Sequence, residues 1–134
     1  VPVGRPEHSE EEVVMVSQAS GRQEQTLPVI EATRDLLKWL LPHLNKFPKT
    51  HRFVLADKME DEGLDLLLLL IDARYTKERG ALLRQANMRL ERLRQLTKLA
   101  TEVRCLSDEQ YRYAANLMHN VGSQIGGWAK GSRA

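Results

Sequence analysis

The sequence predicts an all-α fold, specifically an up-down antiparallel four-helix bundle. Three observations predict it. Apolar residues recur at three- and four-residue steps from Thr26 onward, which is typical of amphipathic helices. No segment shows the two-residue alternation typical of a half-buried strand. Two of the three connections between the helical segments are short, so neighbouring helices should run antiparallel. With 134 residues, of which 42% are hydrophobic, the chain is long enough for one domain with a real core.

Residues 1–25 differ from the rest of the chain. They hold five acidic and two basic residues, and Pro2, Gly4 and Pro6 interrupt any regular structure. We expect an acidic, mostly flexible N-terminal leader, followed by a bundle over residues 26–130 and a C-terminal tail over residues 131–134.

The first helix is expected to begin at Thr26, with Pro28 in the first turn, where proline is tolerated. It should end within Asn45–Pro48, because the residue before a proline disfavours helical geometry. Its apolar face comprises Leu27, Ile30, Thr33, Leu37, Leu40, Leu41 and Leu44.

The second helix is expected over residues 50–75, and its apolar stripe comprises Phe53, Ala56, Met59, Gly63, Leu66, Leu67 and Leu70. The third should run from Lys77 to Arg104, with an inward face of Leu83, Ala86, Leu90, Leu93, Thr97, Ala100 and Val103. Ser107 and Gln110 match a capping box, in which each side chain bonds a free backbone N–H at a helix start. The fourth helix follows, and its apolar side comprises Tyr111, Ala114, Leu117, Met118, Val121, Ile125 and Trp128.

One apolar run exceeds what a lone bundle buries. Residues 66–71 place apolar side chains all around the second helix, because six residues sweep more than one helical turn. Contiguous exposed leucine favours association, so we expect a subunit interface. The alternatives are a deeply central helix or a few tolerated exposed leucines. The predicted interface comprises Leu64, Leu68, Leu69 and Ile71.

The sequence offers no catalytic or cofactor site. The four histidines lack metal-ligand spacing, and Cys105 is expected to pack as a small hydrophobe. The acidic cluster of Asp57, residues 60–62 and Asp65 is expected to be a solvated helix face rather than a cation site. One cysteine, no long apolar run and no signal peptide predict a cytoplasmic protein without a membrane segment.

The third helix is strongly basic. Residues 73–104 hold nine basic and three acidic residues. Seven-residue steps align Lys77, Arg84 and Lys98, with Glu91 as the only acidic residue in this line, and three arginines flank it opposite the predicted core. Such a ribbon suits a phosphate backbone, and the alternative is a solvated arginine-rich face. Aromatic residues are too sparse to predict base stacking.

Three stretches resemble the Avd proteins (accessory variability determinants) of diversity-generating retroelements. The first runs from Leu27-Pro28 through Trp39 to residues 46–53, and the second is the leucine–arginine pattern of residues 83–100. The third and most specific is Val121-Gly122-x-x-Ile125-Gly126-Gly127-Trp128. More distantly, the chain is similar to four-helix-bundle proteins encoded in intervening sequences of bacterial ribosomal RNA genes.

This resemblance implies a ring-like homo-oligomer, a homopentameric barrel, that carries no chemistry of its own. It implies association with the element's reverse transcriptase, its template-repeat RNA and the cDNA made by mutagenic synthesis. Phe47, Pro48, Gly126 and Trp128 would be structural. The residues assigned to nucleic acid or reverse transcriptase are Arg74, Lys77, Arg84, Arg89, Arg92, Arg94 and Lys98, with Lys49 and Arg52 in second rank. The alternative function is an oligomeric protein-interaction module that binds no nucleic acid.

Overall fold

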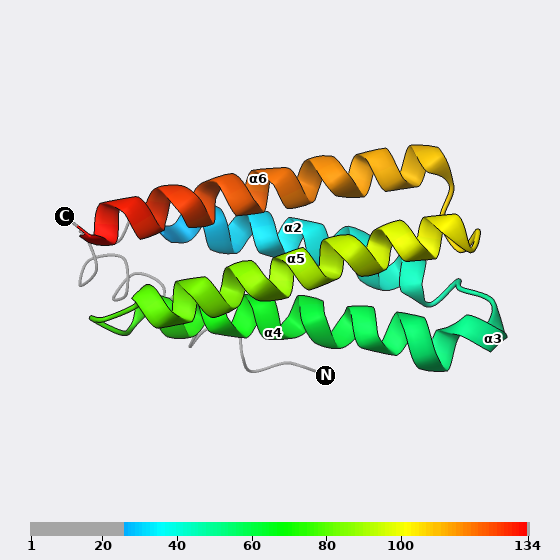
Figure 1. Cartoon of the computed structure of the whole chain (residues 1–134), viewed down its shortest axis with the longest axis horizontal. Helices are drawn as coiled ribbons and strands as arrows, with labels where there is room; N and C mark the ends of the chain where they lie inside the picture. Colours follow the sequence, from blue (N-terminus) through cyan, green and yellow to red (C-terminus); the bar gives the residue numbers. More distant parts are fainter. Residues whose placement is uncertain (1–25, 134) are drawn as a thin grey trace, which may run out of the picture.

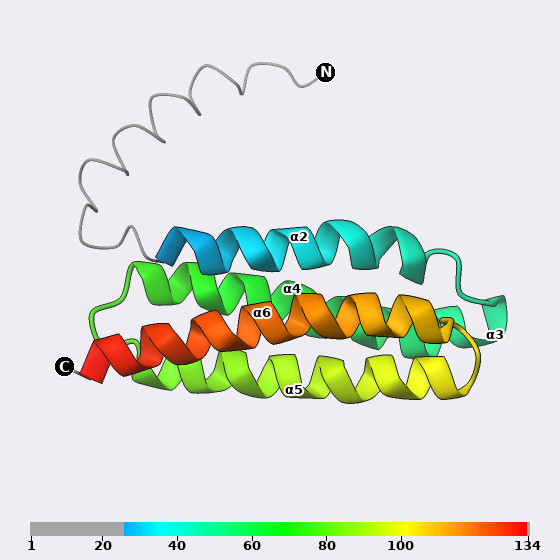
Figure 2. The same cartoon turned by 90° about the horizontal axis from the view of Figure 1, so that it is seen from above.

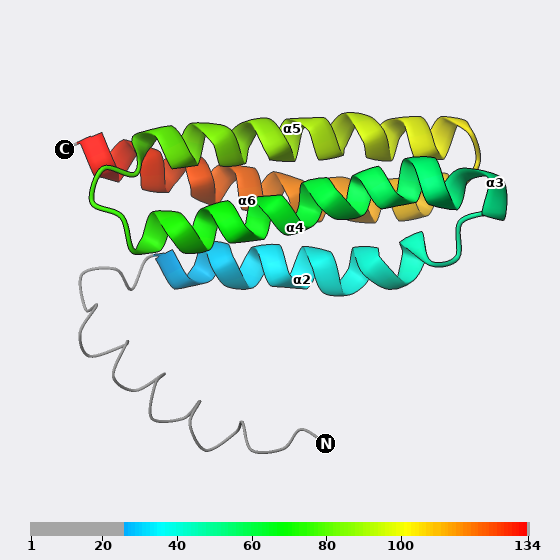
Figure 3. The same ribbon diagram turned by 90° about the horizontal axis from the view of Figure 1, so that it is seen from below.

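The computed structural model describes residues 26–133, and the acidic leader lies outside the described residues. Four long helices form an up-down antiparallel bundle (Figure 1). They are α2 (Thr26–Leu44), α4 (Asp57–Arg74), α5 (Gly80–Glu102) and α6 (Asp108–Arg133). Each helix packs on two neighbours, in the cyclic order α2, α4, α5 and α6 (Figures 2 and 3). The described part of the chain contains no strand, so the predicted fold class is confirmed.

The core lies along the bundle axis and receives one face of every helix. Leu40, Leu66, Leu90 and Ile125 are fully buried examples, one from each helix. At Gly63 of α4, a Cβ atom would lie only 2.7 Å from Leu37 Cδ2, so this glycine lets α2 and α4 approach closely.

The turn between α2 and α4 contains the residues predicted to end the first helix. Phe47 is buried, and Pro48 immediately precedes the short helix α3 (Lys49–His51), so their structural role is confirmed. A π-helical turn, η2 (Arg52–Ala56), then leads into α4. A π turn contains an extra residue, which rotates the preceding side chains relative to the α-helical stripe. The inward position predicted for Phe53 is therefore wrong, because its side chain is 66% exposed.

The third helix is shorter than predicted. It begins at Gly80, because residues 76–79 form a turn in which the Thr76 hydroxyl donates to the Asp72 carbonyl and Arg79 Nε to the Thr76 carbonyl. Lys77 therefore lies outside α5, and its predicted place on the line of Arg84 and Lys98 is wrong. At the other end, α5 ends before Val103, which is 40% exposed instead of buried.

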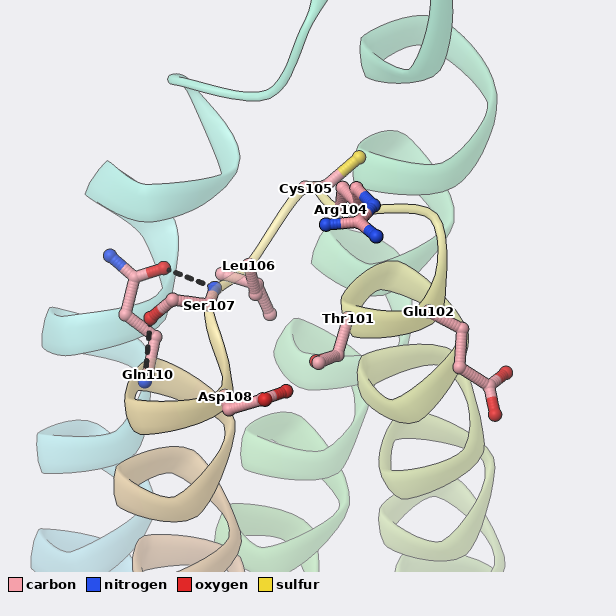
Figure 4. Close-up of a pocket in the computed structure, with 8 residues that line it drawn as sticks. All are labelled: Thr101, Glu102, Arg104, Cys105, Leu106, Ser107, Asp108 and Gln110. Carbon is pink, nitrogen blue, oxygen red and sulfur yellow. Dashed lines mark hydrogen bonds between the residues drawn. The ribbon is translucent and has the colours of Figure 1, made fainter.

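The turn between α5 and α6 combines two capping motifs (Figure 4). The backbone N–H groups of Arg104 and Cys105 donate to the carbonyls of Thr101 and Ala100, which is the hydrogen-bond pattern of a Schellman motif. The predicted capping box is confirmed: Gln110 N donates to Ser107 Oγ (3.0 Å) and Ser107 N donates to Gln110 Oε1 (2.9 Å). Together these bonds satisfy backbone groups at the facing helix ends.

Arg104 occupies a position that favours glycine. Its φ of 69° lies in the left-handed region, which costs an L-residue with a Cβ atom about 1 kcal/mol. We predict that Arg104→Gly raises the free energy of unfolding by about 0.5–1 kcal/mol, because glycine adopts this conformation without strain. Urea denaturation of the full chain measures the change. Arg104→Ala is the matched control, since it removes the same charge and keeps the Cβ atom; an equal gain in both variants would contradict the explanation.

The glycines of α6 have different surroundings. At Gly122 a Cβ atom would lie 2.6 Å from Arg94 Nη2 and 3.2 Å from Leu90 Cδ2, so α5 and α6 pack closely there. At Gly126 a Cβ atom would meet nothing within 4 Å, so the described residues give no packing reason for the structural role that the resemblance implies for this glycine. Trp128 is buried, and the Arg79 guanidinium lies 5.1 Å from its ring centroid. Trp128 is therefore structural, as expected.

No helix in residues 26–133 combines the length and the apolar character needed to cross a membrane.

Candidate nucleic-acid interface

The cations predicted to form one ribbon are divided between two sides of α5. Arg89 and Arg92 contact α4, whereas Arg94 contacts α6. Lys98 lies on the side of α5 that Arg94 occupies, because it follows Arg94 by four residues. Arg84 lies about 80° around the helix from both Arg94 and Arg92, so it points away from the core between the two sides. The two sides differ in what their cations contact.

On the α4 side, two arginines hold a buried carboxylate. Glu62 is completely buried, and its Oε1 accepts a hydrogen bond from Arg89 Nη1 at 3.1 Å. Arg92 Nη2 lies 2.8 Å and Lys58 Nζ 3.9 Å from Oε2, which accepts no well-aligned hydrogen bond from the described residues. Arg89 also pairs with Asp65 (3.5 Å). A buried carboxylate requires such compensation, so the positive charge of Arg89 and Arg92 is used inside the fold.

This network corrects the prediction for the acidic cluster. Asp57, Glu60 and Asp61 are exposed, as a solvated face requires, but Glu62 belongs to the core. Within the part of the chain that the structure describes, no three His, Cys, Asp or Glu side chains gather as a metal site. The carboxylate of Glu62 is matched by protein cations instead.

Arg94 joins α5 to α6. Its Nη2 donates to the Met118 carbonyl at 3.5 Å, above Gly122, and its Nη1 donates to Glu91 Oε1 at 3.3 Å. Hydrogen bonds from Gln95 and Arg94 lower the pKa of the Glu91 carboxyl, which keeps this group anionic. Arg94 thus has a packing role and a partly neutralised charge.

Arg84 and Lys98 remain available to an external anion. Both side chains are exposed, and neither forms an ion pair with any residue in 26–133. The contact between Arg94 and Met118 fixes the antiparallel register, which places Lys130 of α6 level with Arg84. Lys130 and Arg112 are exposed on α6, and they are absent from the predicted contact residues because the predicted ribbon follows the third helix. The α5–α6 face, defined here by Arg84, Lys98, Arg112 and Lys130, presents cations on two neighbouring helices.

The other predicted contact residues are scattered. Arg74 ends α4, where its guanidinium lies 5.5 Å from the ring centroid of Tyr75. Lys49 and Arg52 lie at the opposite end of the bundle, in α3 and η2, and Arg52 Nη1 donates to the Asn45 carbonyl at 3.4 Å. Arg74 and Lys77 thus lie at the turn between α4 and α5, whereas Lys49 and Arg52 lie at the turn between α2 and α4, so these four residues belong to other segments than those of the α5–α6 face.

The four residues of the predicted subunit interface differ in their exposure. Leu64 and Leu68 are 37% and 55% exposed on the outer side of α4. Ile71 is half-buried, and Leu69 packs partly against the core. Two of the four predicted interface residues, Leu64 and Leu68, are therefore exposed, and the subunit interface itself stays a prediction.

The pocket at the α5–α6 turn is lined mainly by polar residues of the turn itself (Figure 4). It encloses about 530 Å³ and is lined by residues such as Glu102, Cys105, Ser107 and Asp108. Burial raises the pKa of the Cys105 thiol, so the nucleophilic thiolate is disfavoured. Ser107 Oγ is engaged in the capping box, and no histidine lines the pocket. Cys105 packs against the core, as expected for a small hydrophobe.

Comparison with known proteins supports the resemblance found in the sequence. None of the curated proteins that were compared matches the chain. Residues 27–132 match the family described as bAvd-like, and this stretch contains all of α4 and α5 and most of α2 and α6. The resemblance to Avd proteins is thereby confirmed, whereas the more distant relation to ribosomal intervening-sequence proteins stays a prediction. The match extends over far more than half of the chain, which therefore belongs to the bAvd-like family.

Proposed function

We propose that the chain is a nonenzymatic accessory subunit of a diversity-generating retroelement. It binds the reverse transcriptase and the template RNA of the element and supports mutagenic cDNA synthesis. Family membership supports the accessory role. The observation that carries the nucleic-acid part is the α5–α6 face, where Arg84 and Lys98 are exposed without an ion pair among the described residues.

The proposed subunit acts as a homo-oligomer, a ring of five copies in the form that the resemblance implies. Leu64 and Leu68 support self-association, because adjacent exposed leucines on one helix face are costly to leave in water. Assembly would place several α5–α6 faces in one particle and strengthen their combined attraction for RNA.

A second candidate is an oligomeric protein-interaction module that binds no nucleic acid. One observation favours it: Arg89, Arg92 and Arg94 are paired within the bundle, so much of the positive charge of α5 already has an intramolecular role. In that case Arg84 and Lys98 would serve only solubility.

A pull-down of the tagged full chain from its native host, at moderate salt, distinguishes the two candidates. We expect recovery of a reverse transcriptase together with one dominant noncoding RNA. A parallel pull-down with the Arg84→Glu/Lys98→Glu variant should recover less RNA. Recovery of neither component by a folded, oligomeric protein would contradict the retroelement function and favour the interaction module.

A further inference from the structure

A cluster of aromatic rings lies on the face shared by α2 and α6. The rings of Trp39 and His43 stack, with centroids 4.0 Å apart and an interplanar angle of 22°. The ring of Tyr113 meets Trp39 at 5.5 Å and 41°. Trp39 and Tyr113 are more than seventy residues apart in the sequence, and the bundle brings them together because α2 packs on α6. We call Trp39, His43 and Tyr113 the aromatic platform.

The inner part of this platform is held in place. Trp39 packs partly against the core. His43 Nδ1 lies 2.7 Å from the Trp39 carbonyl, which can only accept, so the ring nitrogen donates and fixes the imidazole. The Trp39 and His43 rings are thus oriented before any ligand arrives, which reduces the entropy lost on binding.

The outer part of the platform is open. Tyr113 is 54% exposed, although a tyrosine that only filled the core would be covered. Asn116 and Asn120 follow Tyr113 along the same side of α6 at helical spacing, and Gln124 Nε2 donates to Asn120 Oδ1 at 3.1 Å. Side-chain amides of this kind can both donate to and accept from the edge of a nucleobase.

Two exposed cations are close to the platform in the sequence. Arg112 precedes Tyr113 on α6, and Lys46 follows the end of α2; both are exposed and form no ion pair within residues 26–133. Arg112 also belongs to the α5–α6 face, so one cation of that face adjoins the platform in the sequence of α6. A backbone bound by the cations would therefore bring its unpaired bases within reach of the rings.

We propose that the aromatic platform binds an unpaired nucleobase of single-stranded RNA by stacking, with Tyr113 as the outer contact. This inference rests on the proposed nucleic-acid function and deepens it. A base has a π-face of the same kind as the rings, and such stacking tolerates any base. The platform gives the chain a preference for single-stranded over duplex RNA, which charge on the α5–α6 face alone does not provide.

The test compares Tyr113→Ala with Tyr113→Phe in the full chain. The probes are a single-stranded RNA oligonucleotide containing 2-aminopurine and a duplex RNA of equal length. We expect Tyr113→Ala to weaken single-strand binding about tenfold and to reduce the quenching of 2-aminopurine fluorescence, because a stacking partner is lost. Duplex affinity should not change, and Tyr113→Phe should retain single-strand binding because its ring still stacks.

The outcomes separate this inference from the proposed function. A wild-type chain that binds neither RNA would overturn both. A wild-type chain that binds both RNAs, with Tyr113→Ala matching it on the single strand, would overturn the platform alone. An equal loss of affinity for both RNAs in Tyr113→Ala would also overturn the platform. A Tyr113→Ala variant that differs from the wild type only by forming a smaller oligomer in solution would overturn it as well, since that result assigns Tyr113 to a subunit contact.

Discussion

Replacing Arg89 and Arg92 together by methionine is expected to lower the free energy of unfolding by about 3 kcal/mol. The reason is the burial of Glu62, whose carboxylate would lose both guanidinium partners in an interior where an uncompensated charge is costly. The expected loss lies at the lower end of the range for broken buried pairs, because Lys58 Nζ is only 3.9 Å away and its exposed side chain can move closer. Urea denaturation at a fixed protomer concentration measures the change.

Two further variants show whether the cost comes from Glu62. The control Arg84→Met/Lys98→Met removes two cations of α5 that are exposed and unpaired within the described residues, so it should change stability by less than about 1 kcal/mol. Adding Glu62→Leu to the Arg89→Met/Arg92→Met protein should recover most of the lost free energy of unfolding, because an apolar side chain then replaces the buried carboxylate that has no guanidinium partner. A stable double variant, or a triple variant that is no better than the double, would contradict this account of the network.

Reversing the charge of Arg84 and Lys98 is expected to weaken RNA binding by about 10- to 100-fold near 0.1 M salt. Each lost phosphate contact removes about 0.7–0.9 from the slope of log affinity against log salt, so the slope should become shallower by about 1.5. Fluorescence anisotropy with a labelled RNA at several salt concentrations measures both quantities. The fold should be unaffected, because neither side chain has a partner among residues 26–133.

The matched control reverses two exposed cations of α2. Arg34→Glu/Lys38→Glu changes the net charge by the same amount on a different helix from the α5–α6 face, and it also breaks the exposed ion pair between Lys38 and Asp35 (3.3 Å). We expect the RNA affinity to fall at most about two- to threefold, because the change in net charge weakens the overall electrostatic attraction of the protein for RNA. Equal losses in the two variants would show that net charge, rather than the α5–α6 face, determines binding.

The helices could be predicted from the sequence because their signals are local. The spacing of apolar residues and the capping box at Ser107 and Gln110 involve residues within one or two turns of each other, and the structure contains both. Phe53 was misplaced because a π turn gives no periodic signal of its own. Lys77 was misplaced because the turn at residues 76–79 depends on side-chain bonds to the backbone.

The division of the basic residues could not be predicted from one helix. Arg89 and Arg92 look equivalent to Arg84 on the sequence of α5, and only the packing of α4 on α5 shows that they share Glu62. One signal was present: Glu62 lies three residues after Met59 and four before Leu66, within the buried stripe of α4. The aromatic platform could not be predicted for the same reason, since Trp39 and Tyr113 lie on different helices and meet only when α2 packs on α6.

The central claim is that α5 has structural arginines on its α4 side, whereas its exposed Arg84 and Lys98 are the ligand-binding cations. The RNA affinities of the two folded variants described above, one on each set of cations, test it most directly. The account predicts that Glu62→Leu/Arg89→Met/Arg92→Met binds RNA with the affinity and salt slope of the wild type, whereas Arg84→Met/Lys98→Met binds weakly with a shallower slope. A triple variant that loses as much affinity as the double variant, while remaining folded, would contradict it.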